Sequence, residues 1–240
     1  MSLHRTRPTI LAGAVLTALL LSLATPGPAS AAQRWTIPDG ATLLVDGKGY
    51  GHGKGMSQYG AQGAAREGRT YREIVEFYYP GTTWGQVRGL VKVNITADTD
   101  DDVVVVSRSN LRVRDIAGKT VHVLPNKGAK QWRLTTNRKN RAVVQWKSTG
   151  NWKRRKTFVG EAQFQAGGRP ISLVTPHGTV AYRGRLRAAA PSTGSSARDT
   201  VNIVSMENYL RGVVPLEIPA SWHSDAVRAQ SIAARTYATY

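Results

Sequence analysis

The sequence predicts an α+β fold in which a strand-rich antiparallel middle module is flanked by helical segments. Helical apolar patterns with capping residues occupy 57–78, short alternating apolar runs fill 91–190, and another helical pattern starts near Ser224. Strands that run together between helices are typical of α+β proteins rather than of alternating α/β proteins. The chain has no cysteine, so a hydrophobic core must hold this fold without disulfides.

Residues 1–31 are expected to form a secretory signal peptide rather than part of the fold. Arg5 and Arg7 provide a basic start, residues 10–24 are apolar, and residues 29–31 fit a small-x-small cleavage site. The apolar run is short for a membrane span. We therefore expect a secreted or cell-wall protein with no stable membrane anchor after cleavage.

The segment 32–90 begins with a glycine-rich loop and continues as two short helices. Ser57 can cap a helix that runs to about Arg66 and stops at Gly68. Thr70 and Glu73 fit a capping box that starts the second helix. A Pro-Gly pair at 80–81 ends that helix.

The module from 91 to 190 has the pattern of antiparallel strands joined by hairpin turns, such as those at 117–119 and 166–168. An acidic cluster at 98–102 lacks the later glycine and glutamate of a calcium-binding loop, so we expect a tight turn there. The expected strands are 91–95, 111–114, 121–123, 141–146, 157–164, 171–174 and 179–186.

The segment 198–240 carries the carboxylate of greatest interest. A last strand is expected at 201–204, and Glu217 follows between Pro215 and Pro219, among aliphatic residues and just before the helix near Ser224. A carboxyl in an apolar niche resists ionising and can hold a proton near neutral pH, as a general acid must. The alternative is a surface glutamate in a proline-bounded turn.

A second candidate site is the glycine-rich loop around His52. Glycine occupies every second position from 47 to 55, which strips one strand face of side chains and allows a ligand or another backbone to approach. A phosphate-binding loop is excluded, because Lys48 and Gly55 stand where that pattern needs glycine and Ser or Thr. The alternative is a purely structural entry to the following helix.

The stretch 127–156 holds six lysines, five arginines, three tryptophans and no acidic residue, within a chain of net charge +18. Cations interleaved with aromatics are typical of a nucleic-acid surface. The cations also alternate with strand-like apolar positions, as on the solvated faces and edges of a β module. We favour the solvated face, with attraction to anionic wall polymers, since an exported protein should rarely meet nucleic acid.

No metal site or cofactor is expected. Thiolate ligands are impossible without cysteine, and the four histidines beyond the signal peptide have no pair at metal-ligand spacing.

Two stretches resemble the stage II sporulation protein D (SpoIID/LytB) family, which acts on bacterial peptidoglycan. The run Met206–Ala238 resembles the family's core, with Leu-Glu-Ile-Pro-Ala-Ser at 216–221 in place of its SEMPAS-like motif. The run Gly51–Ala61, followed by the FYYPGT-like ending at 77–82, resembles a second family signature. Here that second signature comes first, the reverse of the usual order.

The resemblance implies a lytic transglycosylase that cleaves glycan strands to 1,6-anhydro ends, with Glu217 as the single acid/base. The residues implied to hold sugar hydroxyls and carboxylates are His52, Gly53, Gly55, Ser57, Gln58, Tyr59, Gln230 and Arg235. Family members continue beyond the Ala-Arg-Thr-Tyr-Ala segment into a His- and Cys-containing segment that can bind zinc, so the chain is expected to be C-terminally truncated. The alternative is a non-catalytic modifier that enhances a cell-wall amidase, and the third choice is a basic nucleic-acid-binding protein.

Overall fold

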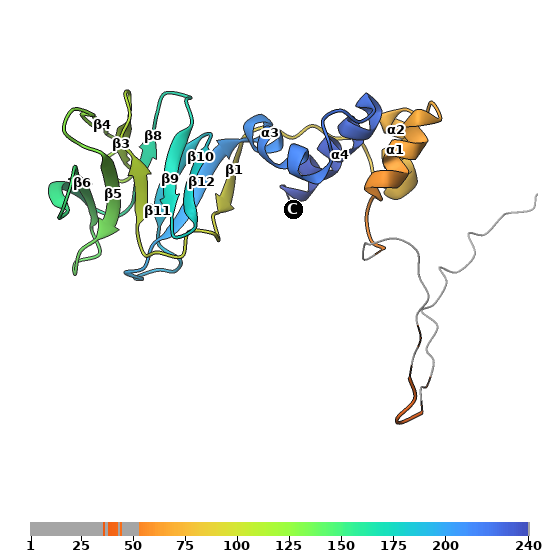
Figure 1. Cartoon of the computed structure of the whole chain (residues 1–240), viewed down its shortest axis with the longest axis horizontal. Coiled ribbons are helices and arrows are strands. Elements are labelled where there is room, and N and C mark those ends of the chain that lie inside the picture. Colours follow the sequence, from red (N-terminus) through yellow and green to blue (C-terminus); the bar gives the residue numbers. More distant parts are fainter. Residues whose placement is uncertain (1–35, 37, 43, 45–52, 240) are drawn as a thin grey trace, which may run out of the picture. The chain divides into compact units, whose positions relative to one another are not determined.

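The computed structural model describes residues 36, 38–42, 44 and 53–239. The chain divides into two compact units, Met1–Tyr50 and Gly51–Tyr240. In the first unit the described residues form a turn, in which the Ala41 N–H donates to the Pro38 carbonyl. The expected signal peptide at 1–31 lies outside the described residues. The second unit holds every described helix and strand (Figure 1).

The prediction of an α+β fold is confirmed, because two antiparallel sheets lie between helices in the chain order. The helices are α1 (Gln58–Arg66), α2 (Tyr71–Tyr78), α3 (Met206–Glu217) and α4 (Ser224–Tyr237). No helix in the described ranges is both long and apolar enough to cross a membrane.

The twelve strands form two six-stranded sheets. The first sheet has the order β1-β12-β11-β8-β3-β4, and the second has the order β10-β9-β2-β5-β6-β7. The strands are β1 (Leu90–Asn94), β2 (Val103–Val106), β3 (Arg112–Asp115), β4 (Val121–Val123), β5 (Gln131–Thr136), β6 (Ala142–Lys147), β7 (Lys153–Phe158), β8 (Ala162–Gln165), β9 (Ile171–Thr175), β10 (Gly178–Tyr182), β11 (Arg185–Ala189) and β12 (Asp199–Ser205).

Both sheets contribute to one hydrophobic core, so they pack face to face. Val113, Phe164 and Leu186 from the first sheet share this core with Trp132 and Leu134 from the second. Strands β4 and β7 are the last strands of their sheets on one side of the order, and each therefore has a free edge.

Several strand boundaries differ from the prediction. The single strand expected at 157–164 is two strands, because Gly160 adopts a positive φ of 73° and turns the chain between β7 and β8. Gly184, with φ 94°, likewise divides the strand expected at 179–186. Strands β2 and β5 were not predicted. Strand β12 pairs with both β1 and β11, so the sheets extend past residue 190 to Ser205.

The predicted helix starts are confirmed in detail. The Ser57 hydroxyl caps α1 by accepting from the Gly60 N–H, and Thr70 and Glu73 form the expected capping box on α2. Helix α4 begins at Ser224 with Asp225 in its first turn, where a negative charge is favourable. Three helices pack together through small apolar residues, chiefly Ala61 and Ala65 of α1 and Ala226 and Ala229 of α4, against Ile74 of α2.

Candidate functional site

Glu217 is the last residue of helix α3, where the sequence suggested a turn. The helix runs through Pro215, which lies in its last turn and therefore removes one helical hydrogen bond there. Leu210, Val214 and Ile218, spaced four residues apart, face the core, while Pro215 and Leu216 are exposed beside Glu217. The expected apolar niche is therefore wrong: the aliphatic sequence neighbours point elsewhere, and the Glu217 carboxylate is exposed.

The Glu217 carboxylate is held by the first residue of helix α1. The Gln58 side-chain amide donates a hydrogen bond of 3.1 Å to Oε2 of Glu217. The Ser57 cap, in which Oγ lies 3.0 Å from the Gly60 nitrogen, sets where α1 begins and therefore where Gln58 lies. Ser57, Gln58 and Glu217, all candidates from the sequence, are thus brought together.

Aromatic rings lie next to this hydrogen bond in both segments. Tyr59 follows Gln58 and packs against Trp222, with ring centroids 5.1 Å apart and planes inclined by 57°. The Tyr59 side chain is 79% exposed, whereas Trp222 is half-buried and packs against the α3 cluster. The exposed ring offers an apolar surface with a polar hydroxyl at its edge, which suits a ligand of mixed character.

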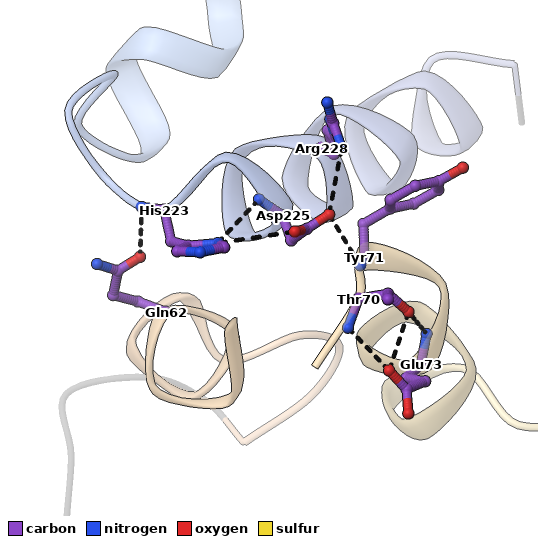
Figure 2. A network of polar contacts seen from close by, with 7 residues as sticks. All are labelled: Gln62, Thr70, Tyr71, Glu73, His223, Asp225 and Arg228. Atoms are coloured by element: carbon purple, nitrogen blue, oxygen red, sulfur yellow. Dashed lines mark hydrogen bonds and ion pairs between the residues drawn. The ribbon is translucent and has the colours of Figure 1, made fainter. Parts of the chain in front are cut away.

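A network of polar contacts fixes the loop that joins α3 to α4 (Figure 2). The buried Gln62 side chain of α1 accepts a 2.9 Å hydrogen bond from the His223 N–H, and the His223 ring caps α4 by accepting from the Asp225 N–H. Asp225 in turn accepts from the Tyr71 N–H, at the start of α2, and pairs with Arg228. The starts of α2 and α4 are therefore tied together, and the chain after Glu217 is anchored to α1.

The glycine-rich loop is described only from Gly53 onward. Gly53 and Gly55 have φ of 71° and 74°, a conformation that favours glycine. A side chain at Gly55 would also meet the Tyr79 hydroxyl at 3.4 Å. The backbone conformation alone therefore accounts for both glycines. This agrees with the alternative that the loop is a structural entry to α1. His52 lies outside the described residues.

The two candidates on α4 differ in their surroundings. Arg235 forms a 2.7 Å ion pair with Glu207, in the first turn of α3, whereas Glu217 ends that helix about 15 Å away at 1.5 Å per residue. Arg235 therefore joins the two helices rather than the Glu217 site. Gln230 is half-buried, and its side-chain amide makes no hydrogen bond to any residue that the structure describes. The two residues lie five positions apart, about 140° around the helix, so they face different sides of α4.

The tryptophans of the basic stretch are engaged within the protein. Trp132 is buried in the core and Trp146 packs against it, with the Lys153 ammonium 5.2 Å from its ring centre. Trp152 lies between Arg133 and Lys147, each 4.5 Å from its ring centre. These contacts agree with the solvated β face that we favoured over a nucleic-acid surface.

The acidic cluster lies in the connection from β1 to β2, which crosses from the first sheet to the second over residues 95–102. The expected tight turn is therefore a longer loop, whose turn is at 96–97. Asp98 accepts a 2.6 Å hydrogen bond from the Thr200 hydroxyl, and Asp102 pairs with Arg133 at 3.2 Å. Burial raises the pKa of both carboxyls above the ordinary value. Among the residues that the structure describes, no three His, Cys, Asp or Glu side chains gather in a way that could hold a metal ion.

The structure also adds residues that sequence reasoning missed. Gln62 and Trp222 position the segment that follows Glu217, and Glu207 is the ion-pair partner of Arg235. A buried glutamine has no sequence signature, because only the packing of α1 on α4 shows that its amide is enclosed. Trp222 lies three residues after Pro219, in the same segment as Glu217. This proximity in sequence could have indicated that it packs near the site.

The candidate site therefore lies on helices and presents one exposed carboxylate, that of Glu217. The Gln58 amide holds this carboxylate, and the Tyr59–Trp222 ring pair lies next to it. Comparison with known proteins finds a family match for the segment that contains Glu217. Residues 195–240 match the family model SpoIID, described as Stage II sporulation protein. This segment is therefore similar to the stage II sporulation protein family, as the motifs at 206–238 predicted.

Individual relatives match over stretches of similar length. The amidase enhancer of Bacillus subtilis (strain 168) is 58% identical over 45 residues, which are 19% of this chain and 6% of that protein. The stage II sporulation protein D of Bacillus subtilis (strain 168) is 54% identical over 44 residues, 18% of this chain and 13% of that protein. That of Bacillus amyloliquefaciens is 49% identical over 43 residues, 18% and 12% of the two chains. The chain thus spans about a tenth of the relatives it matches. No solved structure matches it.

Proposed function

We propose that this chain is a cell-wall-related sporulation-family protein that cleaves peptidoglycan glycan strands as a lytic transglycosylase, with Glu217 as the acid/base. The observation that carries the proposal is the hydrogen bond from Gln58 to Glu217. It joins the family-matched segment to the glycine-rich signature, which the family match does not cover. This contact between two segments that separately resemble one family supports the proposal of a single site.

One carboxyl is sufficient for this reaction, because the substrate supplies its own nucleophile. Most glycosidases need a second carboxylate as base or nucleophile. Here Glu217 would protonate the glycosidic oxygen as the bond from that oxygen to C1 of muramic acid breaks. The resulting carboxylate would then take the proton from the 6-hydroxyl as O6 bonds to C1. The product is a 1,6-anhydro end, and Glu217 regains its proton.

The exposure of Glu217 is compatible with a polymeric substrate. A glycan strand laid over α3 and α1 would cover the carboxyl and exclude water, which favours the neutral, proton-carrying form. Gln58 would orient the carboxyl, and the exposed face of Tyr59 would pack against the apolar face of a sugar ring. Ser57, Gly53, Gly55, His52 and Gln230 remain proposed contacts to the strand.

The proposal includes a secreted or cell-wall location, with glycan strands as the main partner. The signal-like sequence at 1–31 supports export, and the net charge of +18 supports attraction to anionic wall polymers. No step of the proposed chemistry requires a metal or cofactor.

A second function is favoured by one specific observation, the 58% identity to a relative named amidase enhancer. In that case the chain would bind wall glycan or a wall amidase and stimulate the amidase, without cleaving glycan itself. Nothing in the Glu217 geometry is needed for that role, so the two functions can be separated by one substitution.

The deciding experiment compares the full chain with Glu217→Gln on purified glycan strands. Glutamine keeps an oxygen that can accept from Gln58, so the fold and glycan binding should persist while proton transfer is lost. We expect anhydro-muropeptide formation to fall by about a hundredfold or more. Equal product from both proteins would refute the role of Glu217 as acid/base. No product from either protein, together with amidase stimulation by both, would refute the enzyme and support the enhancer.

A further inference from the structure

The β module contains a cationic cleft between the edge strands of its two sheets. A cavity of about 360 Å³ lies where β4 and β7 face each other, with the buried side chains of Val113, Leu124 and Val144 in its lining. His122 of β4 and Arg155 and Lys156 of β7 line it as well. The site is formed by residues that neither the family segment nor the Glu217 site uses.

A β-bulge directs two successive cations into this cleft. In a regular strand, neighbouring side chains point to opposite faces. On β7, however, Lys156 pairs with Val144 and Arg154 pairs with Gln145, so Arg155 is an extra residue with no partner on β6. Such a bulge re-aims a side chain. As a result, Arg155 and Lys156 line the same cavity.

Lys156 is held in place by groups from both sheets. Its ammonium donates to Nδ1 of His122 at 3.4 Å and lies 5.7 Å from the ring centre of Phe158. The His122 ring stacks on Phe158, with centroids 5.3 Å apart and planes within 20°, and its Nε2 lies 3.2 Å from the Thr120 hydroxyl. Lys156 is exposed, and these contacts give its ammonium partners from both sheets.

The charge in the cleft is not neutralised by the part of the chain that the structure describes. Neither Arg155 nor Lys156 forms an ion pair with any described carboxylate, although six other ion pairs are present. Two like charges that converge in one cavity repel each other, and a bound anion would relieve that repulsion. Arginine offers a planar fork that matches a phosphate, and lysine adds a point charge.

We propose that the cleft between β4 and β7 binds a phosphodiester group of a polyol-phosphate polymer, a flexible anionic chain that lacks bases. Single-stranded nucleic acid binds through aromatic rings that stack on its bases. The tryptophans nearest to this strand are occupied by the core or by cations, so the observations favour a chain without bases.

The test measures binding of poly(glycerol phosphate) to the full chain at two salt concentrations. The double variant Arg155→Gln, Lys156→Gln removes both cations of the cleft. The double variant Arg138→Gln, Lys139→Gln removes the same charge from an exposed turn between β5 and β6 and serves as the control. We expect the cleft variant to bind at least tenfold more weakly with a shallower salt dependence, and the control to change less than twofold.

Equal losses in the two double variants would overturn the site, because they would show attraction to net charge alone. No loss in the cleft variant would overturn it as well. Single-stranded DNA with the same number of phosphates is the second probe, and tighter binding of DNA than of poly(glycerol phosphate) would overturn the choice of polymer. Glu217→Gln should bind the polymer like the unaltered chain, which separates this inference from the proposed glycan cleavage.

Discussion

The side-chain amide of Gln58 donates a 3.1 Å hydrogen bond to the carboxylate of Glu217, although 159 positions separate the two residues. Gln58 belongs to the glycine-rich signature and Glu217 to the segment that matches the stage II sporulation protein family. The two signatures stand in reversed order along this chain. Their contact brings one residue of each signature together despite that order.

Removing the Gln58 amide tests whether it positions the acid/base. In Gln58→Leu the carboxyl of Glu217 loses a charge-assisted hydrogen bond, which is worth about 1.5 kcal/mol or more. We expect kcat on glycan strands to fall about tenfold while KM and the melting temperature change little. The separate measurement of kcat and KM checks this, and a change confined to KM would show that Gln58 only binds the strand.

The exposed ring of Tyr59 is expected to contribute to glycan binding. Tyr59→Ala removes an apolar surface beside Glu217 at little cost to the fold, because the side chain is 79% exposed. Glycan binding should weaken by about tenfold, measured as Kd by titration with denuded strands. Tyr237→Ala is the matched control, since Tyr237 is 82% exposed and is the last residue of α4. Equal effects of the two variants would contradict a specific role for Tyr59.

Two glycines of α1 should respond in opposite ways to alanine. A Cβ at Gly60 would lie 2.0 Å from the Tyr78 hydroxyl, whereas a Cβ at Gly63 would meet nothing within 4 Å. Gly63→Ala should therefore raise the free energy of unfolding by about 0.5–1 kcal/mol through helix propensity. Gly60→Ala should lower it by about 1 kcal/mol, because overpacking outweighs that gain.

Chemical denaturation of each glycine variant measures these free energies. Adding Tyr78→Phe to Gly60→Ala removes the clashing hydroxyl and should recover most of the loss. If Gly60→Ala proves as stable as Gly63→Ala, the contact between Gly60 and the Tyr78 hydroxyl does not limit the packing of α1 on α2.

The half-buried Asp102 gives stability a defined pH dependence. Burial raises the pKa of its carboxyl despite the neighbouring Arg133. Since the folded state then binds a proton at higher pH than the unfolded state, this group makes the fold more stable as pH falls through the raised pKa toward 3.8. Asp102→Asn removes the titration, and Arg133 keeps its contacts with Gln145 and Trp152.

We therefore expect Asp102→Asn to be at least as stable as the unaltered chain at pH 7, with the difference shrinking as pH falls to about 4. Denaturant unfolding at several pH values measures it. If Asp102→Asn is instead less stable than the unaltered chain at pH 7, with a deficit that shrinks as pH falls, the ion pair with Arg133 outweighs the cost of burial.

Much of the helical part could be predicted because its signals are local. Ser57, Thr70, Glu73 and Asp225 each act within one helical turn of their own position, so spacing alone indicated where α1, α2 and α4 begin. The strands were harder. The four valines of β2 carry a local strand signal that the prediction missed, whereas the alternation of β5 is interrupted by cations and its place is set by pairing with β2 and β6. The splits at Gly160 and Gly184 depend on backbone turns that an apolar pattern does not reveal.

By itself, the sequence determined the fold class, the starts of α1, α2 and α4, the acid segment and the resemblance to a cell-wall family, since each rests on neighbouring residues. Only the tertiary structure decided that Glu217 is exposed, that Gln58 holds it, and that Arg235 is committed to Glu207. It also decided that a bulge brings Arg155 and Lys156 together. The physical reason is that burial and partnership depend on which faces meet when distant segments pack, and aliphatic neighbours in sequence need not be neighbours in space.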